Sequence, residues 1–382
     1  MAWFTTKKPS DDGGRRSRTV ARAGALLAGA TLAASALVGA GSPALAEGPT
    51  TSDALVFVPY NGQTFTVWRN GNVVQPVRFS TQQVIEGNFS SAGGTDLFLY
   101  NQGSGSDGIL HVTPSGTTST TSFRPESVSG AYRPLVGDFD ANGVEDIFWY
   151  APGSSPDSIW LFQPDGSHTT KSQSVTGSYQ PTVTEASADG YDDIIWYAPG
   201  TAADSIWLFG AGAGHTTKTV TINGSYQLIT GYFGFTGEGE PGQRVVFFNP
   251  SGPDSIWTFD TDAGHTSAPL PNVDGAFVPV VGNYLDKLSD QILYYRPGAG
   301  SERFVGFTDD GTPQQYEPPS VYGDYDPSVG DFDGNGYSDI AWSSGGKATL
   351  WKFNGGGYST ASIVTNTVNT ITATARYDIP EV

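Results

Sequence analysis

The sequence predicts an all-β fold, a β-propeller of seven four-stranded blades, from three observations. Similar segments recur every 47 to 51 residues between Gly87 and Gly330, which is the length of one propeller blade. Each segment alternates short strand-like runs with turns rich in Gly, Pro, Asp and Ser. The first segment lacks its innermost strand, and the C-terminus supplies a spare one.

The repeat is clearest where each unit begins. The residues from Gly137 read GDFDANGVEDI, and those from Gly330 read GDFDGNGYSDI. An apolar run follows both, and the first continues into Ala-Pro-Gly, which ends at Gly153. The unit starts are Gly87, Gly137, Thr184, Gly231, Gly282 and Gly330. Self-similarity at a nearly fixed period is the signature of a repeat architecture.

Four strands can be placed in the unit that contains Gly137, and we name them A to D. They are expected at residues 132–139, 147–150, 158–162 and 168–175. No stretch after residue 46 shows helical periodicity, so we expect no helix of normal length in the domain.

The two ends of the chain predict how the ring closes. Residues 53–59, 64–68 and 73–80 resemble strands B, C and D of a first unit that has no strand A. A seventh strand A is expected at residues 377–382 (YDIPEV). We therefore expect this strand to complete the first blade and close the ring, which also hides edges that invite aggregation. Deleting residues 377–382 is expected to open or unfold the molecule.

Residues 1–46 are predicted to be a cleaved export signal. Six basic residues precede or begin the apolar run 23–38, and Ala44-Leu45-Ala46 forms a small-residue cleavage site. The run is too short for a good membrane span, so we expect no membrane insertion. The pair Arg15-Arg16 leaves both the twin-arginine and the general secretory (Sec) routes open. Residues 47–382 then form the propeller, secreted to the outside of the cell.

The charge balance excludes several classes of partner. The chain has 19 basic and 38 acidic residues, of which six and two lie in residues 1–46, so the remainder carries a net charge of −23. Such a surface repels nucleic-acid phosphates and anionic lipids, and it suits a protein that holds divalent cations. The chain has no Cys, so no disulfide contributes to its stability.

The loops that open the units are predicted calcium sites. Calcium prefers several oxygen ligands, which short loops supply at alternating positions, with a Gly at the sharp turn. The two complete sets are Asp138, Asp140, Asn142, the Val144 carbonyl and Asp146, and Asp331, Asp333, Asn335, the Tyr337 carbonyl and Asp339. A weaker set is Glu185, Ser187, Asp189 and Asp193. The alternative is turn chemistry without a metal.

The other loops have lost the pattern. The loop at Gly87 has poor ligands, and the loop at Gly231 carries an insertion at residues 234–242. The loop at Gly282 has Lys287 in place of a ligand, where its ammonium group is expected to replace the charge of the ion.

These loops resemble the FG-GAP (or VCBS) repeats of integrin alpha-chain propellers and of many secreted bacterial proteins. The resemblance covers essentially all of residues 47–382, and its most specific stretch is Gly137 to Gly153. It implies seven blades, with calcium in the A–B loops on one face and ligands on the opposite face or between blades. Some similar proteins are lectins that bind amino sugars, and some are lectin subunits of secreted toxin particles. Fold follows from such a resemblance far better than function does.

A lectin would need aromatic rings beside polar groups on the face opposite the calcium loops. The candidate ligand-binding residues there are Asp157, Asp204, Asp254, Tyr132, Tyr179 and Tyr226. Three copies of a weak site would gain affinity through multivalency. The alternative for each Asp is a turn that starts a strand. For the repeated Trp149, Trp160, Trp196, Trp207 and Trp257, packing between blades is favoured over sugar stacking.

Binding is favoured over catalysis. The sequence has no G-x-S-x-G, H-E-x-x-H or P-loop motif, and it has no Cys for nucleophilic catalysis. The expected function is a secreted calcium-binding lectin, with the targeting subunit of a toxin or another exported complex as the role we expect. Its partners would be cell-surface glycans or polysaccharides and other secreted subunits. A polysaccharide lyase or hydrolase with one cleft, and a protein-docking module without sugar binding, are the two alternatives.

Overall fold

The computed structural model describes residues 52–375, apart from gaps at 60–63, 76–78, 80, 92–95, 104–105, 116–117, 154, 201–202, 235–242, 299, 309–310, 319, 346 and 365–369. The predicted export signal at residues 1–46, most of the insertion 234–242 and the predicted closing strand at 377–382 therefore lie outside the described residues.

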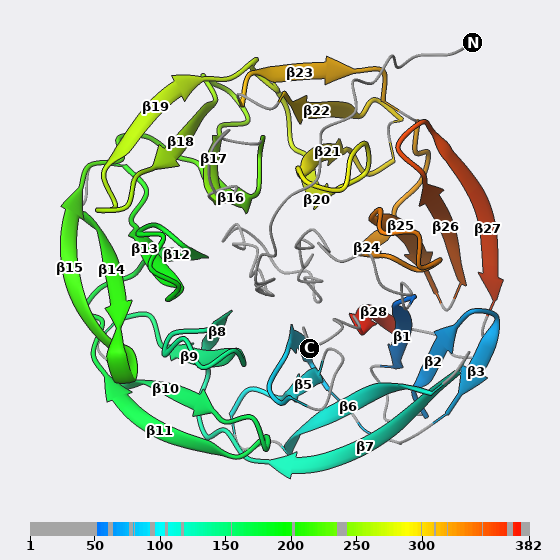
Figure 1. Cartoon of the computed structure of the whole chain (residues 1–382), viewed down its shortest axis with the longest axis horizontal. Helices are drawn as coiled ribbons and strands as arrows, with labels where there is room; N and C mark the ends of the chain where they lie inside the picture. The colour runs from blue at the N-terminus through cyan, green and yellow to red at the C-terminus, as the bar shows by residue number, and fades with distance from the viewer. Residues whose placement is uncertain are drawn as a thin grey trace, which may run out of the picture.

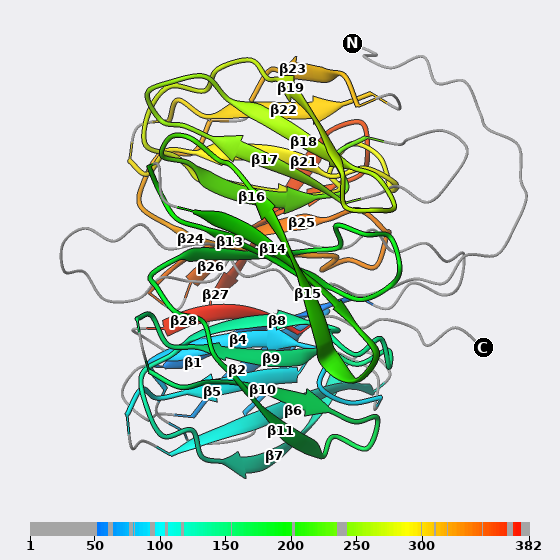
Figure 2. The same ribbon diagram turned by 90° about the vertical axis from the view of Figure 1, so that its left-hand side faces the viewer.

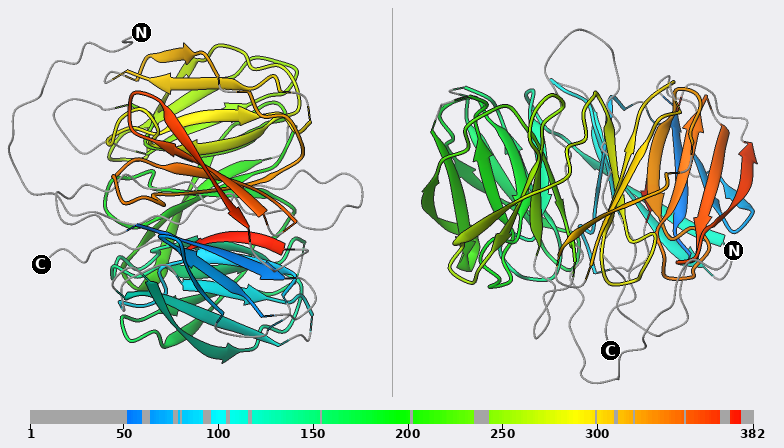
Figure 3. Two further views of the ribbon diagram at one scale, coloured as in Figure 1. Left: turned by 90° about the vertical axis from the view of Figure 1, so that its right-hand side faces the viewer. Right: turned by 90° about the horizontal axis from the view of Figure 1, so that it is seen from above.

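Seven four-stranded antiparallel sheets stand as blades around a central axis (Figure 1), which confirms the predicted fold. The side views show the blades fanned around a flat ring (Figures 2 and 3). Within each blade the order is A, B, C, D from the centre outward.

The first four blades contain sixteen strands. In the order A to D they are β28 (Thr370–Ala375), β1 (Ala54–Pro59), β2 (Thr66–Arg69) and β3 (Asn72–Val74) in blade 1; β4 (Gln83–Gly87), β5 (Asp96–Tyr100), β6 (Asp107–Ser115) and β7 (Thr118–Glu126) in blade 2; β8 (Arg133–Gly137), β9 (Asp146–Tyr150), β10 (Asp157–Phe162) and β11 (His168–Gln173) in blade 3; and β12 (Gln180–Thr184), β13 (Asp193–Tyr197), β14 (Asp204–Gly210) and β15 (Gly214–Val220) in blade 4.

The remaining blades follow the same order. They are β16 (Gln227–Gly231), β17 (Arg244–Phe248), β18 (Ser255–Phe259) and β19 (His265–Pro269) in blade 5; β20 (Val278–Gly282), β21 (Gln291–Tyr295), β22 (Arg303–Phe307) and β23 (Pro313–Tyr316) in blade 6; and β24 (Asp326–Gly330), β25 (Asp339–Ser344), β26 (Lys347–Phe353) and β27 (Tyr358–Val364) in blade 7. Among the described residues the one helix is a short 3-10 turn, η1 (Ala211–Ala213), and no helix there is long and apolar enough to cross a membrane.

Strand position within a blade explains its composition. Strands B such as β9 (DIFWY) and β13 (DIIWY) are buried along their whole length because neighbouring blades cover both faces of the sheet. They therefore read as continuous apolar runs without alternation. The outermost strands, such as β11 (HTTKSQ), are polar because solvent reaches them.

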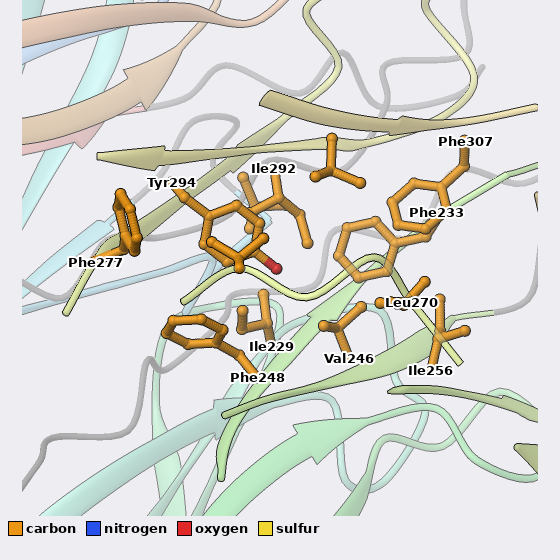
Figure 4. Packing of buried hydrophobic residues seen from close by; sticks show 13 residues of the cluster. Ile229, Phe233, Val246, Phe248, Ile256, Leu270, Phe277, Ile292, Tyr294 and Phe307 are labelled. Carbon is orange, nitrogen blue, oxygen red and sulfur yellow. The ribbon is translucent and has the colours of Figure 1, made fainter. Parts of the chain in front are cut away.

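The apolar core is divided among the seven junctions between blades. Each junction holds one cluster of buried side chains. In the junction between blades 5 and 6, Phe233 and Phe248 of blade 5 pack against Ile292, Tyr294 and Phe307 of blade 6 (Figure 4). Burial of this kind is the main favourable term in folding, so the ring is stabilised blade against blade.

The C-terminal strand completes blade 1, as predicted, but it is not the strand we expected. β28 (Thr370–Ala375) pairs with β1 along six residues, from Ala54 opposite Ala375 to Pro59 opposite Thr370. The sequence predicts this strand at residues 377–382, because Tyr377 resembles the Tyr that precedes other A strands. The strand is instead the run TITATA, in which β-branched residues alternate with small ones, a pattern that fits a pleated strand.

Candidate cation and ligand sites

The antiparallel order places the loops of each blade on two faces of the ring. The A–B and C–D loops lie on one face, and the B–C loops lie on the other, together with the connections from strand D to the next strand A. We call these the A–B face and the B–C face. The predicted calcium loops belong to the A–B face and the predicted sugar-binding residues to the B–C face.

The two complete loops each gather three carboxylates. Asp138, Asp140 and Asp146 offer oxygen atoms that all lie within 4.8 Å of one another. The second group is Asp331, Asp333 and Asp339, whose oxygen atoms also lie within 4.8 Å of one another. Among the described residues these are the two groups of at least three acidic or His side chains close enough to share one ion.

Hydrogen bonds within each loop fix its shape. In blade 3 the Asp138 carboxylate accepts from the N–H groups of Asn142 at 3.1 Å and Gly143 at 2.9 Å. Gly143 has a φ of 88°, a conformation that favours glycine. The Asn142 side chain accepts from the Val144 N–H at 2.9 Å and donates to the Phe162 carbonyl at 2.7 Å.

The loop of blade 7 repeats this arrangement. Asp331 accepts from Asn335 N–H and Gly336 N–H, at 3.0 and 2.7 Å. Asn335 accepts from Tyr337 N–H and donates to the Phe353 carbonyl, at 2.8 and 2.7 Å. The two loops are thus built alike from the same residue types at the same spacing.

The donor set of these loops fits a hard divalent cation. Asp140 Oδ1 and Asp339 Oδ2 are buried and have no hydrogen-bond partner among the described residues. Burial, together with the neighbouring charge of Asp140, raises the pKa of Asp146 to about 9. Burial and the charge of Asp333 raise the pKa of Asp339 to about 8. Clustered, partly unpaired carboxylates are costly without a cation and are the ligands that calcium prefers.

In three other blades a side-chain nitrogen lies at the corresponding position or contacts the carboxylate there. The first residue of strand B pairs with the last residue of strand A in each, and these residues are Asp96, Arg244 and Gln291. Asp96 Oδ1 lies 2.6 Å from Nδ1 of His111. Arg244 Nη1 donates to the Phe233 carbonyl at 2.6 Å, and Gln291 Nε2 donates to the Asp286 carboxylate at 3.2 Å.

In blades 2, 5 and 6, contacts of the side-chain nitrogens of His111, Arg244 and Gln291 are therefore found where blades 3 and 7 have clustered carboxylates. The sequence predicts that the Lys287 ammonium group replaces the charge of an ion in the loop of blade 6. The structure contradicts this prediction. Lys287 Nζ instead donates to the Asn335 carbonyl of blade 7 at 2.6 Å and lies 5.0 Å from the ring centre of Tyr337.

The weaker set of candidate calcium ligands, in blade 4, accepts hydrogen bonds from groups of its own loop. Asp193 Oδ2 accepts from the Ala186 N–H at 2.9 Å and from Ser187 Oγ at 3.1 Å. Glu185 accepts from Gly190 N–H and Asp189 from Tyr191 N–H. Burial raises the pKa of Asp193 to about 7. Glu185, Asp189 and Asp193 do not form a third close group in the described structure.

The three candidate Asp residues on the B–C face have a structural role in this geometry. Asp157, Asp204 and Asp254 are each 2% exposed. In Asp157 one oxygen accepts from the Ala151 N–H and the other from the Val175 N–H, both at 2.7 Å. The other two repeat this with main-chain donors at 2.7–2.8 Å. Each carboxylate joins the B–C loop to the segment after strand D, which favours the turn alternative over direct contact with a sugar.

The three candidate Tyr residues lie on the B–C face and pack against the apolar clusters of the blade junctions. Tyr132, Tyr179 and Tyr226 are half-buried and directly precede β8, β12 and β16. The main chain of each is held by a second Tyr from the preceding blade. Tyr150, for example, donates its hydroxyl to the Gly177 carbonyl at 3.0 Å and accepts from the Tyr179 N–H at 2.8 Å.

This arrangement of two Tyr residues and a Gly recurs around the ring. Tyr100 holds Tyr132 and Tyr197 holds Tyr226 in the same way. Sequence reasoning found the outer Tyr of each pair but not the inner one, because the inner Tyr ends a strand B that reads as plain core.

The repeated Trp residues pack between strands, as favoured from the sequence. Trp149 and Trp196 are 1% exposed, and Trp160 and Trp257 are also buried. The half-buried Trp207 stacks on His215 with ring centres 3.7 Å apart. The pairs Trp160–His168 and Trp257–His265 stack likewise, which gives the recurring His a packing role.

Two solved structures have a fold similar to that of this chain. A lectin from Agrocybe aegerita, described as recognising non-reducing terminal N-acetylglucosamine, superposes with a TM-score of 0.67. It is 12% identical, and the match covers 87% of this chain and 97% of the lectin. A protein from Lactobacillus plantarum matches with a TM-score of 0.57 and 13% identity, over 85% of this chain and 99% of that one.

The chain is a seven-bladed β-propeller. At these identities the likeness concerns the fold alone. No protein-family model matches the propeller, so its membership of the FG-GAP family stays a prediction. No curated protein matches its sequence either.

Proposed function

We propose that the propeller is an exported, calcium-binding protein that binds carbohydrate on its B–C face. The observation that supports sugar binding best is that a fixed Tyr ring beside a polar side chain recurs in blades 3, 4 and 5, and the same pairing of two Tyr residues recurs for Tyr295 and Tyr325 before blade 7. Tyr132, Tyr179 and Tyr226 are followed by Arg133, Gln180 and Gln227. Sugar binding needs an aromatic face together with hydrogen-bond donors and acceptors, and three copies give avidity.

The geometry around these rings supports a preformed site. A Cβ on Gly177 would lie 2.9 Å from the Tyr179 ring, so the absence of a side chain there lets the ring lie against the main chain. The Arg133 guanidinium donates to the Tyr179 carbonyl at 3.1 Å, which connects neighbouring copies across a blade junction. Rings held in this way lose little entropy when they bind a ligand.

Two further points favour this proposal. The Agrocybe aegerita lectin has the same architecture and is described as binding a terminal amino sugar. A ring of similar surface copies suits binding better than a reaction, which usually depends on one asymmetric constellation of groups. A role as the targeting subunit of an exported complex would use such multivalent binding.

Calcium enters the proposal as a structural ion. Asp138, Asp140 and Asp146 would hold one ion, and Asp331, Asp333 and Asp339 a second. Bound there, calcium supplies positive charge that lets buried carboxylates stay ionised. Both groups lie on the A–B face, so the ion would act on loop order and not by touching the sugar.

The test is a glycan array with residues 47–382, run with calcium and again with a chelator. We expect binding to a narrow group of glycans, with terminal N-acetylglucosamine included as a probe. The triple variant Tyr132→Ala, Tyr179→Ala, Tyr226→Ala is expected to lose binding, whereas His168→Gln on the outer rim should retain it. Blank arrays from folded protein would contradict the lectin proposal, and release of oligosaccharides from a polysaccharide would favour the enzyme alternative.

A further inference from the structure

A hydrogen-bonded clasp joins each described A–B loop from blade 2 onward to the blade that follows it. The first residue of the loop donates its N–H to the side chain just before strand B of the next blade. The six pairs are Asn88–Glu145, Asp138–Asp192, Glu185–Gln243, Tyr232–Asp290, Asn283–Ser338 and Asp331–Asp53, at 2.7 to 3.2 Å. In five of them, the second residue returns its own N–H to the carbonyl of the first.

Two clasps begin at a candidate cation ligand. Asp138 is clasped to Asp192 of blade 4, and Asp331 is clasped to Asp53 of blade 1. In the second clasp the Asp331 N–H lies 2.7 Å from Asp53 Oδ2, and the Asp53 N–H lies 2.7 Å from the Asp331 carbonyl. The same residue therefore faces the carboxylate cluster with its side chain and blade 1 with its main chain.

The next residue of the loop also binds blade 1. Phe332 is 1% exposed and belongs to the apolar cluster that contains Leu55 and Phe57 of β1. Asp333, the following residue, is again a member of the carboxylate cluster. The contact with blade 1 is thus made by residues that alternate along the loop with the candidate ligands.

Chain connectivity makes this junction different from the one next to the blade 3 site. Blades 3 and 4 follow each other in the chain, so a covalent link remains if their clasp breaks. Within the described part of the chain, β1 to β3 are held to blade 7 and β28 by the β1–β28 ladder, the Asp53–Asp331 clasp and the apolar cluster that contains Phe332. We call this junction the seam.

We propose that the cation loop of blade 7 is the latch of the ring, so that emptying it opens the seam first. This inference rests on the cation sites of the proposed function and adds a role to one of them. Without a cation, three carboxylates within 4.8 Å of one another repel. The loop that carries Asp331 and Phe332 then loses its fixed shape, so the seam loses the clasp and the contacts that Phe332 makes within the apolar cluster.

The matched variants are Asp333→Asn and Asp140→Asn, which change the third position of the two loops. Hydrogen–deuterium exchange of the full mature chain would be followed peptide by peptide, with calcium and with a chelator. In the wild type we expect chelation to speed exchange of β1 and β28 by roughly tenfold more than that of β13, because local openings report local stability. Asp333→Asn is expected to show the same pattern with calcium present, whereas Asp140→Asn should leave β1 and β28 protected.

The outcomes separate this inference from the proposed function. If the two variants leave β1 and β28 equally protected, blade 7 is not the latch. If calorimetry detects no calcium binding to the wild type, the cation sites themselves are wrong and the latch falls with them. A blank glycan array alongside selective opening of the seam would overturn the lectin proposal and uphold the latch. Should Asp333→Asn fail to fold, the order of exchange in chelated wild type decides, and simultaneous opening of all blades would overturn the inference.

Discussion

Asp53 and Asp331 are joined by two hydrogen bonds of 2.7 Å, although they lie 278 residues apart in the chain. One residue precedes the first described strand and the other opens the A–B loop of the last blade. Their contact is therefore among the few that hold the beginning of the ring to its end.

Removing the Asp53 carboxylate is expected to weaken the ring at this point. Asp53→Ala leaves the partly buried Asp331 N–H without its acceptor, which costs about 1–3 kcal/mol where water does not replace the bond. Gln243→Ala is the control, because Gln243 gives the same acceptor to Glu185 between blades 4 and 5. Chemical denaturation should show similar losses for both. Only Asp53→Ala should speed proteolysis within β1, and equal cleavage in the two variants would contradict this expectation.

Truncation tests which C-terminal residues close the ring. A chain ending at Ala375 retains all six pairs between β28 and β1, so we expect it to keep the stability of the full chain. A chain ending at Val364 loses the ladder and exposes the edge of β1, so it should unfold at a lower temperature or aggregate. Circular dichroism melting curves of the two proteins would show this. Unfolding of the longer chain would restore our sequence-based assignment of the closing role to residues 377–382.

The buried Asp on the B–C face should affect stability and not sugar affinity. In Asp204→Asn the amide group can accept only one of the two main-chain N–H bonds that the carboxylate now accepts, from Ala198 and Ile222. We expect a loss of about 2–4 kcal/mol in the free energy of unfolding, since hydrogen bonds to charged groups are among the stronger ones. Glycan titration of the folded protein should give an unchanged affinity, and a selective loss of affinity at full stability would assign Asp204 to the ligand site.

Two His residues should make the propeller less stable in acid. Burial, and then the charges of Lys171 and Lys218, lower the pKa of His215 and His265 below the ordinary value. The unfolded chain then binds more protons than the folded one as the pH falls through the unfolded pKa of about 6.5, so stability decreases there. The double variant His215→Phe, His265→Phe keeps stacking on Trp207 and Trp257 and should lose less Tm between pH 7.5 and 5.5 than the wild type. An identical decrease would exclude these His residues as the cause.

Much of the fold could be predicted because the repeat carries strong local signals. The four strands placed in blade 3 agree with β8 to β11 within two residues at each end. Strand B is a continuous apolar run bounded by turns, and strand C begins at a fixed Asp. The closing strand β28 escaped prediction because its TITATA sequence has none of the aromatic and Pro residues that mark strand A elsewhere.

The role of Asp157 illustrates what the sequence left open. An Asp beside a turn fits both a sugar contact and a main-chain hydrogen bond. The structure favours the main-chain hydrogen bond, because the Val175 N–H donates to the second oxygen of Asp157. Val175 lies 18 residues away and reaches Asp157 only after strands C and D have paired. The side-chain nitrogens of His111, Arg244 and Gln291 in blades 2, 5 and 6 were also not recognised from the sequence. Arg244 aligns with Asp146 only through strand pairing, because an insertion lengthens the A–B loop of blade 5. Gln291 follows Gly282 at the same spacing at which Asp146 follows Gly137, but its residue type alone did not reveal the hydrogen bonds of its amide.

The pairing of Ala54 with Ala375 places the two ends of the described chain beside each other, at the same end of two neighbouring strands. The ring therefore does not depend on where its covalent chain begins. A circular permutant that joins these ends by a short linker, and opens the chain in the connection between β15 and β16, would keep every blade and every clasp. The break in connectivity would then move to the junction of blades 4 and 5, where Gln243 supplies the clasp and where the described residues include no close group of three carboxylates.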